Sequence, residues 1–287
     1  MLRLDRIHPR ISGNKWYKLK YNLEEAKGQN KNTLLTFGGA YSNHITATAA
    51  AGKEYGFKTI GIIRGEELQT PPRPSPLGRE KNQTLGFAKE CGMQLHFVSR
   101  EDYRKKDSAE FISKLTEQFG DFYLLPEGGT NELAVKGCSE IISLIDIPFD
   151  YVCCPVGTGG TLAGIISSLK GDQKAIGFSV LKGGEFLKIE IKKLLTSPFH
   201  PSKGELNTNY HFGGYGKYSP QLLKFIEDFE QQNSGSTSLT TSIPLEQVYT
   251  GKMMFGIYDL IGKGYFPKNT TVIAIHTGGL QGKWPQP

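Results

Sequence analysis

Short apolar runs alternate with helical patterns along almost the whole chain. The runs that predict strands are Leu34–Phe37, Thr59–Arg64, Gln94–Val98, Tyr123–Leu125, Tyr151–Pro155, Ala175–Leu181 and Thr271–Ile275. The segments that predict helices are Trp16–Lys27, Asn43–Tyr55, Gln83–Cys91, Tyr103–Phe119, Asn131–Leu144, Leu162–Leu169, Glu185–Leu195, Pro220–Gln231 and Gly251–Ile261. Because the strands are apolar throughout, they fit parallel sheets that are covered on both faces. The pattern therefore predicts an α/β fold.

Two stretches interrupt this alternation. Gln69–Gly78 is rich in proline, which excludes an inner strand and a regular helix, so we expect an exposed loop there. Gln231–Thr241 is polar and contains Ser-Gly-Ser-Thr-Ser, which is typical of a second loop.

Composition narrows the function classes. The net charge is +6, but the basic residues are mixed with acidic ones, so a nucleic-acid surface is not favoured. The four cysteines form no metal-type C-x-x-C pair and are interpreted as core residues in a reducing compartment: Cys91, Cys138, Cys153 and Cys154. We see neither a secretory leader nor an apolar stretch of the ~18 residues needed to cross a bilayer. We therefore expect a cytoplasmic protein with no metal, membrane or nucleic-acid partner.

Three strand ends carry candidate chemistry, because parallel α/β sheets bind ligands at the carboxyl ends of their strands. In Phe37–His44, two glycines precede Ser42 and Asn43, either of which can cap the next helix. The start of that helix offers free N–H groups, to which a carboxylate could bind. The alternative is a helix cap without any ligand. The third strand end, Ile273–Gly279, finishes in Thr277 and two glycines, and can equally be a simple turn.

The second strand end, Cys154–Gly164, contains Gly157-Thr-Gly-Gly-Thr161 at a predicted helix start. Converging backbone N–H groups and the threonine hydroxyls suit a phosphate. A dinucleotide fingerprint fits less well, because Leu162 stands where its third glycine should be. In addition, the next strand ends in Leu181-Lys182 without an acidic residue that could bind a ribose. We therefore interpret the loop as a monophosphate site.

Lys15 follows Gly13-Asn14 and falls at or next to a helix start. The positive end of a helix lowers the pKa of an amine and favours the neutral nucleophile. Most lysines are only solvated charges, so this spacing alone does not establish a role for Lys15.

Read together, the motifs resemble the 1-aminocyclopropane-1-carboxylate (ACC) deaminase/D-cysteine desulfhydrase family of pyridoxal-phosphate (PLP) enzymes. The resemblance covers nearly the whole chain, and its five segments occur in the order that the family has. They are Ser12-Gly-Asn-Lys-Trp-Tyr-Lys-Leu19, Phe37-Gly-Gly-Ala-Tyr-Ser-Asn-His44, Gly157-Thr-Gly-Gly-Thr161, Val248-Tyr-Thr-Gly-Lys-Met-Met254 and His276-Thr-Gly-Gly279.

The resemblance implies a role for each motif. Lys15 would hold PLP as a Schiff base, and Asn43 would bind the hydroxyl of the cofactor ring. The phosphate would be held by the loop residues Gly157, Thr158, Gly159, Gly160 and Thr161. Ser42, Asn43 and His44 would receive the substrate carboxylate, with Lys18 also near the substrate. Tyr249 would pack near ring and substrate, with Thr250 and Thr277 beside the cofactor, and the implied catalytic residues are Lys15, Ser42 and Tyr249.

The family fold is that of tryptophan synthase β (PLP fold type II), in which two α/β domains hold the cofactor in the cleft between them. The resemblance also implies that the protein forms a homodimer. We expect a small domain at residues 20–126 and a large PLP-binding domain formed by residues 1–19 and 127–287. This family has a further segment before the cofactor lysine, whereas fourteen residues precede Lys15 here, a difference that bears on stability rather than chemistry. Gln69–Gly78 resembles an insertion.

The activity that the resemblance implies is that of a lyase or deaminase acting on a small amino acid. ACC deaminases have a glutamate after the site tyrosine and leucine before the final Gly-Gly, where this chain has Thr250 and Thr277. This pattern resembles the D-cysteine desulfhydrase branch, and we expect β-elimination that yields a 2-keto acid, ammonia and sulfide. The alternatives are ring opening of ACC and a non-catalytic protein that binds PLP or an amino acid, which the intact Lys15 disfavours.

Overall fold

The computed structural model describes residues 1–66, 82–195, 203–233 and 243–280. The loop expected at Gln69–Gly78 lies outside the described residues, as does most of the loop expected at Gln231–Thr241. The chain divides into a large unit, residues 1–18 with 131–287, and a small unit, residues 19–130. The units meet between residues 18 and 19 and between residues 130 and 131, which is one and four residues from the expected boundaries at 19/20 and 126/127.

The small unit contains a four-stranded parallel sheet in the order β4-β3-β2-β5. Its strands are β2 (Thr33–Gly38), β3 (Lys58–Arg64), β4 (Gln94–Val98) and β5 (Tyr123–Leu125). Its helices are α2 (Asn43–Tyr55), α3 (Gln83–Glu90), α4 (Arg100–Arg104), α5 (Ala109–Phe119) and the 3-10 turn η3 (Glu127–Gly129). Helix α1 (Asn14–Gly28) begins in the large unit and ends in the small one.

Both faces of the small sheet are apolar, which explains the unbroken apolar runs of its strands. Ile60 and Ile62 of β3 pack on one face with residues of α4 and α5. Ile63 points the opposite way and packs with Ile45 of α2 and Leu85 of α3. Successive residues of one strand thus fill two separate cores, as the period of two in a strand requires.

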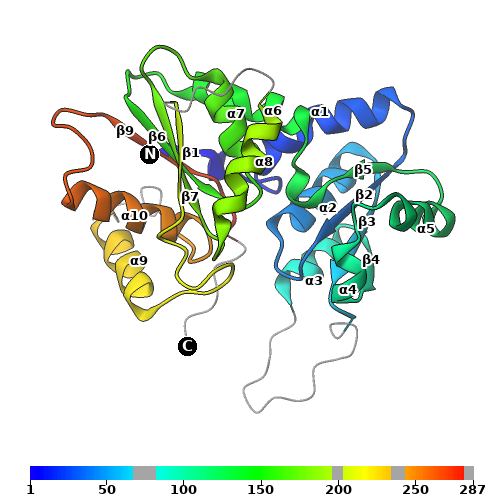
Figure 1. Ribbon diagram of the computed structural model, residues 1–287. Helices are drawn as coiled ribbons and strands as arrows, with labels where there is room; N and C mark the ends of the chain where they lie inside the picture. Colours follow the sequence, from blue (N-terminus) through cyan, green and yellow to red (C-terminus); the bar gives the residue numbers. More distant parts are fainter. Residues whose placement is uncertain (67–81, 196–202, 234–242, 281–287) are drawn as a thin grey trace. The chain divides into compact units, whose positions relative to one another are not determined.

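The large unit contains a five-stranded parallel sheet in the order β1-β9-β6-β7-β8. Its strands are β1 (Leu2–Arg3), β6 (Tyr151–Val156), β7 (Lys174–Ser179), β8 (Gly204–Asn207) and β9 (Val272–His276). Its helices are α6 (Glu132–Ser139), α7 (Gly160–Ser168), α8 (Leu187–Leu194), α9 (Pro220–Gln232) and α10 (Thr250–Gly262), with the 3-10 turns η1 (Leu4–Arg6), η4 (Glu140–Leu144) and η5 (Gly184–Phe186). Figure 1 shows helices on both faces of each sheet.

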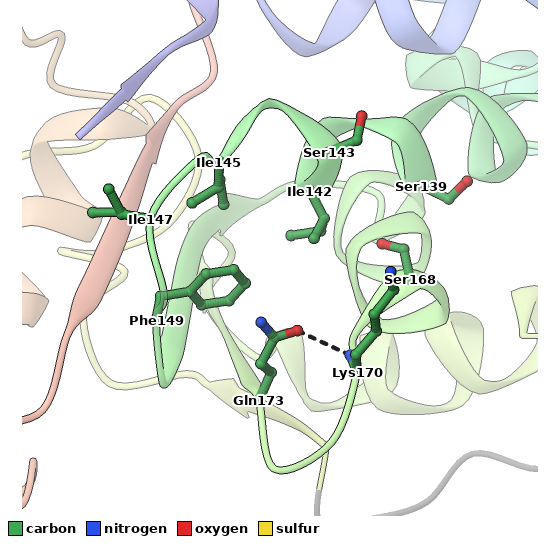
Figure 2. Close-up of a pocket in the computed structure, with 9 residues that line it drawn as sticks. All are labelled: Ser139, Ile142, Ser143, Ile145, Ile147, Phe149, Ser168, Lys170 and Gln173. Carbon is green, nitrogen blue, oxygen red and sulfur yellow. Dashed lines mark hydrogen bonds between the residues drawn. The ribbon is translucent and has the colours of Figure 1, made fainter.

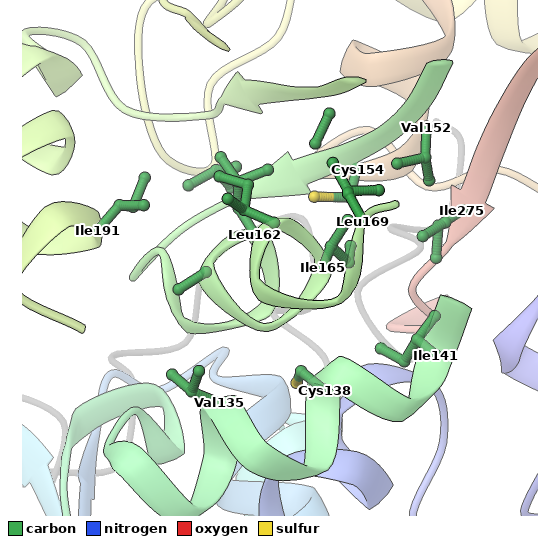
Figure 3. Packing of buried hydrophobic residues seen from close by; sticks show 14 of the residues in the cluster. Val135, Cys138, Ile141, Val152, Cys154, Leu162, Ile165, Leu169, Ile191 and Ile275 are labelled. Carbon is green, nitrogen blue, oxygen red and sulfur yellow. The ribbon is translucent and has the colours of Figure 1, made fainter. Parts of the chain in front are cut away.

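The two faces of the large sheet are covered by different helices. Figure 3 shows the first core, in which Val152 and Cys154 of β6 meet Leu162 of α7 and Val135 of α6. On the other face, Cys153 lies in a second core with residues of α9 and α10. The adjacent cysteines therefore belong to opposite faces of one buried strand, and the expected parallel α/β fold is confirmed.

Some expected elements differ in the structure, and two short strands were missed. The helix expected at Asn131–Leu144 is α-helical only as far as Ser139 and continues as the 3-10 turn η4. The helix expected at Tyr103–Phe119 is divided into α4 and α5, because Ser108 caps a new helix start by accepting from the N–H of Phe111. Strand β7 ends at Ser179 rather than Leu181, since the Leu181 N–H turns to the Ser179 hydroxyl. The short strands β1 and β8 were not expected, because two and four residues show little periodicity.

Among the described residues, no helix combines the length and apolar character that crossing a membrane requires.

Candidate active site

The start of α1 is fixed against the carboxyl end of β9. Gly13 has a positive φ of 71°, and a Cβ placed on it would overlap the backbone carbonyl of Thr277. The N–H of Asn14 donates to that carbonyl oxygen at 3.2 Å. Glycine is thus required at position 13 by both conformation and space. The close approach of the Gly13 and Thr277 backbones fixes the start of α1 and therefore the position of the Lys15 Cα.

The Lys15 amine lies in a polar chain that reaches the phosphate loop. Its Nζ donates to Asn14 Oδ1 at 3.3 Å, and Asn14 Nδ2 donates to Thr161 Oγ1 at 2.7 Å. The pKa of the Lys15 amine is lowered from 10.5 to about 7, mainly by burial and to a smaller extent by the positive charge of Lys18. A large fraction of the amine is therefore neutral at physiological pH. Burial, rather than the helix end invoked from the sequence, is the main cause.

Lys18 lies one helical turn further along α1 and is almost completely buried. Its Nζ donates to Thr158 Oγ1 at 3.2 Å, and burial lowers the pKa of this amine to about 8. The structure therefore places the Lys18 cation at the Gly157–Thr161 loop, whereas the resemblance had assigned it to the substrate.

The Gly157–Thr161 loop joins β6 to α7. Gly159 occupies the N-cap position of α7 with φ 86° and provides no side-chain cap, so the first backbone N–H groups of this helix remain available for a ligand. A Cβ on Gly159 would lie 2.6 Å from the Ile191 side chain. This loop therefore combines backbone N–H groups, the hydroxyls of Thr158 and Thr161, and the nearby Lys18 cation.

Tyr249 and Thr250 are held by a buried carboxylate. Glu246 accepts from the backbone N–H groups of Val248, Tyr249 and Thr250 at 2.6–3.0 Å and from the Thr250 hydroxyl at 3.1 Å. The Tyr249 ring contacts the phosphate loop, since a Cβ on Gly157 would lie 3.3 Å from it. Thr250 is completely buried, and its hydroxyl proton is already used by Glu246. The hydroxyl of Thr250 therefore offers at most a lone pair to a further partner.

Thr277 follows the buried His276 at the end of β9. The N–H of Gly278 donates to His276 Nδ1 at 3.2 Å, so the proton of the neutral ring is on Nε2, which donates to Pro244 O at 2.7 Å. Burial lowers the pKa of His276, which agrees with a neutral ring. His276 thus fixes the backbone on either side of Thr277.

Tyr215 was not identified from the sequence. Its ring lies edge-on to that of Tyr249, with centroids 5.9 Å apart, and 42% of the residue is exposed. The only sequence signal was an aromatic residue between Gly213-Gly214 and Gly216, all of which have positive φ. Their spacing does not reveal that this turn meets Tyr249.

In the small unit, Ser42 caps α2. Its Oγ accepts from the N–H groups of His44 and Ile45 at 3.3 and 3.4 Å. Asn43 is half-buried, and its side-chain amide makes no hydrogen bond to another described residue. The His44 ring lies in the core, where Nε2 is 2.7 Å from Thr36 Oγ1, so His44 contributes its backbone N–H rather than its ring to the helix start.

We expect Ser42→Ala to lower activity at least about tenfold, in addition to the loss of about 0.5–2 kcal/mol in unfolding free energy that removal of a cap causes. Ser108→Ala is the matched control, because Ser108 caps α5 in the same unit and α5 carries none of the expected site residues. Urea unfolding and steady-state kinetics measure both variants. If Ser42→Ala loses only stability, Ser42 is a helix cap and nothing more.

A separate hollow of about 320 Å³ lies near the amino end of β6 in the large unit. Figure 2 shows Ile142, Ile145 and Phe149 lining it, with Ser139, Ser168 and Gln173 around them. None of the site residues expected from the sequence lines this hollow.

The residues of the large unit fit PLP. Lys15 provides an amine that is partly neutral near pH 7, and Lys18 lies beside a glycine-rich helix start with two threonine hydroxyls. An aldehyde needs such an amine, and a phosphate monoester needs such donors and positive charge.

Comparisons with known proteins agree with this fit. Residues 1–183 match the model of the family described as pyridoxal-phosphate dependent enzymes. A putative 1-aminocyclopropane-1-carboxylate deaminase of Pyrococcus horikoshii is 28% identical over 95% of this chain and 81% of its own. A bifunctional D-cysteine desulfhydrase/1-aminocyclopropane-1-carboxylate deaminase of Arabidopsis thaliana, described as mitochondrial, is 29% identical over 95% of this chain and 70% of its own.

A solved structure of an ACC deaminase homologue superposes with a TM-score of 0.80 and 26% identity, covering 98% of this chain and 84% of that one. The Lys15 amine with its lowered pKa, the adjoining glycine-rich Gly157–Thr161 loop and these similarities lead to one assignment. The chain belongs to the family of pyridoxal-phosphate dependent enzymes.

Proposed function

We propose that this enzyme is a lyase that eliminates the β-substituent of a small amino acid, with D-cysteine as the preferred substrate. The products would be a 2-keto acid, ammonia and sulfide, the balance being completed by one water molecule. The observation that carries the proposal is the half-buried Lys15 residue, whose amine has its pKa lowered to about 7 and is joined through Asn14 to the Gly157–Thr161 loop.

Lys15 has two tasks in this proposal. As a neutral amine it would hold the carbonyl carbon of the cofactor, and as a base it would move the proton of the substrate α-carbon. PLP, when bound, supplies the electron sink that makes this proton acidic. A pKa near 7 suits the second task, since such a base accepts and returns protons at physiological pH.

The phosphate contacts are assigned to the large unit. Thr158 and Thr161 would donate their hydroxyls, and the first N–H groups of α7 would add backbone donors. Lys18 would supply positive charge without competing for the cofactor carbonyl, because its Nζ already donates to Thr158.

The carboxylate contacts are assigned to the small unit. The start of α2 supports this assignment, because the Ser42 hydroxyl and the backbone N–H group of Asn43 are donors suited to an anion, whereas the His44 N–H is used by the Ser42 cap. The Asn43 amide, which has no hydrogen-bond partner among the described residues, would bind the hydroxyl of the cofactor ring.

Thr250 and Thr277 support β-elimination over ring opening. A carboxylate beside the ring nitrogen of PLP would keep that nitrogen protonated and deepen the sink, whereas a hydroxyl compensates less charge. A weaker sink suffices when a good leaving group departs from Cβ. The buried carboxylate of Glu246 accepts a hydrogen bond from the Thr250 hydroxyl. This nearby negative charge reduces the electrostatic difference between Thr250 and a glutamate at the same position.

ACC ring opening is the second candidate, and the name of the Pyrococcus horikoshii relative supports it. The PLP-loaded enzyme should therefore be assayed with D-cysteine, L-cysteine and ACC, with sulfide, pyruvate and 2-oxobutyrate as readouts. We expect sulfide and pyruvate from D-cysteine, and at least about tenfold lower catalytic efficiency with ACC. Efficient formation of 2-oxobutyrate from ACC, without sulfide from D-cysteine, would reverse the assignment.

A further inference from the structure

Lys252 is a completely buried lysine of α10, and it lies three residues after Tyr249. Burial of an ammonium group is costly unless hydrogen bonds compensate for the lost water. Here Nζ donates to the carbonyl oxygens of His211 and Gly214, at 2.9 and 2.8 Å. Burial lowers the pKa of Lys252 to about 8, so the amine is mostly cationic at pH 7 and these are charge-assisted hydrogen bonds.

Both carbonyls belong to the turn that carries Tyr215. The His211 oxygen also accepts the N–H of Gly214 at 3.0 Å, and the Gly214 oxygen also accepts the N–H of Lys217 at 3.1 Å. Lys252 therefore joins two consecutive turns, 211–214 and 214–217, and Tyr215 lies in the second of them. Without such a link, this glycine-rich turn would have many conformations available and little burial to restrict them.

Two further contacts of this segment are also made with α10. Tyr210 donates its hydroxyl to Asp259 at 2.6 Å, and the Phe212 ring meets that of Phe255 with centroids 5.0 Å apart. The segment thus runs along α10 from its C-terminal end towards its start, and Lys252 makes the last contact before Tyr215. Tyr215 then lies edge-on to Tyr249, whose ring contacts the phosphate loop.

We propose that Lys252 is a positioning residue of the active site, which holds Tyr215 against Tyr249 through the carbonyls of His211 and Gly214. The kinetic consequence rests on the proposed function, whereas the conformational one does not. Lys252 itself touches no reacting group. It acts only by ordering the turn that carries Tyr215.

The first test is hydrogen–deuterium exchange of the PLP-loaded protein. In Lys252→Met, the amides of Gly214 and Lys217 should exchange at least about tenfold faster, because two charge-assisted hydrogen bonds are lost. Amides in α10 and in the β-strands should keep their rates, since Tyr210 and Phe212 still hold the start of the segment. Lys224→Met is the matched control, because Lys224 is an exposed lysine of α9 that pairs with Asp228, and it should leave both sets of exchange rates unchanged. Unchanged exchange at Gly214 and Lys217, or faster exchange throughout the large unit, would overturn the proposal.

The second test is a double-mutant cycle with Tyr215→Ala, using any substrate that the enzyme converts. Lys252→Met and Tyr215→Ala should each lower kcat/KM at least about tenfold, and the double variant should be no worse than Tyr215→Ala. If the fold-losses in kcat/KM of the two single variants multiply in the double variant, Lys252 acts independently of Tyr215, and its proposed role in positioning Tyr215 is refuted. If Lys252→Met does not fold, Lys252→Gln replaces it, because a shorter amide cannot reach both carbonyls. Absence of any turnover refutes the proposed function, while the exchange experiment still decides the role of Lys252.

Discussion

Replacing Lys15 by methionine should abolish turnover and at the same time stabilise the cofactor-free protein at neutral pH. Activity should fall at least about a thousandfold, because no other group takes over both the binding of the cofactor carbonyl and the α-proton. Borohydride reduction of the PLP-loaded wild-type protein, followed by peptide mapping, should place the pyridoxyl group on Lys15 rather than Lys18. Recovery of the label on Lys18 would reverse the roles assigned to the two amines.

The gain in stability follows from the sign of the pKa shift. Folding lowers the pKa of Lys15 from 10.5 to about 7, so the buried cation destabilises the folded state fully below pH 7. As the pH rises from 7 to 10.5, the folded amine is already neutral while the unfolded one still holds its proton, and wild-type stability increases. Lys15→Met should therefore be more stable by about 1–3 kcal/mol near pH 6, a difference that disappears towards pH 10.5.

Urea unfolding of the cofactor-free proteins across this pH range measures the effect. Lys20→Met is the control, since Lys20 lies on the same helix but its Nζ lies over the ring of Tyr21, 4.7 Å from the ring centroid. Its unfolding free energy should stay within about 0.5 kcal/mol of the wild type. If Lys15→Met and the wild type were equally stable at pH 6, the Lys15 amine would not carry the burial cost inferred here.

Gly13→Ala should nearly eliminate PLP binding while leaving Lys15 in the sequence. The new Cβ would overlap the Thr277 carbonyl in a backbone conformation, φ 71°, that disfavours alanine. Because the obstructing atoms are backbone, no side-chain rotation relieves the overlap, and the start of α1 must shift. We expect a loss of about 2–4 kcal/mol in unfolding free energy and at least about tenfold weaker cofactor affinity.

Gly28→Ala is the matched control for this substitution. Gly28 ends the same helix, and a Cβ placed there meets no atom within 4 Å. Alanine at position 28 should be neutral or stabilising by up to about 1 kcal/mol. Cofactor titration by absorbance distinguishes the two variants. If Gly13→Ala binds PLP as tightly as Gly28→Ala, the contact between α1 and β9 does not position Lys15.

Much of the fold could be predicted because its elements obey local rules. The unbroken apolar runs of β3 and β6 indicated strands covered on both faces, and Ile60, Ile62 and Ile63 indeed fill cores on opposite sides of one sheet. Ser42 was expected as a cap from its place between a strand and a helix, and it is one. The motif around Lys15 indicated PLP through its resemblance to the family, because Gly13, Lys15 and the Gly157–Thr161 loop occur in the order that the family has.

The sequence by itself therefore determined the α/β class and the order of most elements, because hydrophobic period, helix caps and glycine turns depend on neighbours along the chain. It indicated the family only through the resemblance of five motifs in order. Only the tertiary structure decided that burial and Lys18 lower the pKa of Lys15, that Glu246 accepts a hydrogen bond from the Thr250 hydroxyl, and that Lys252 donates to the carbonyls of His211 and Gly214. Burial, and contacts between residues as distant in sequence as Lys252 and His211, arise only when separate segments pack together.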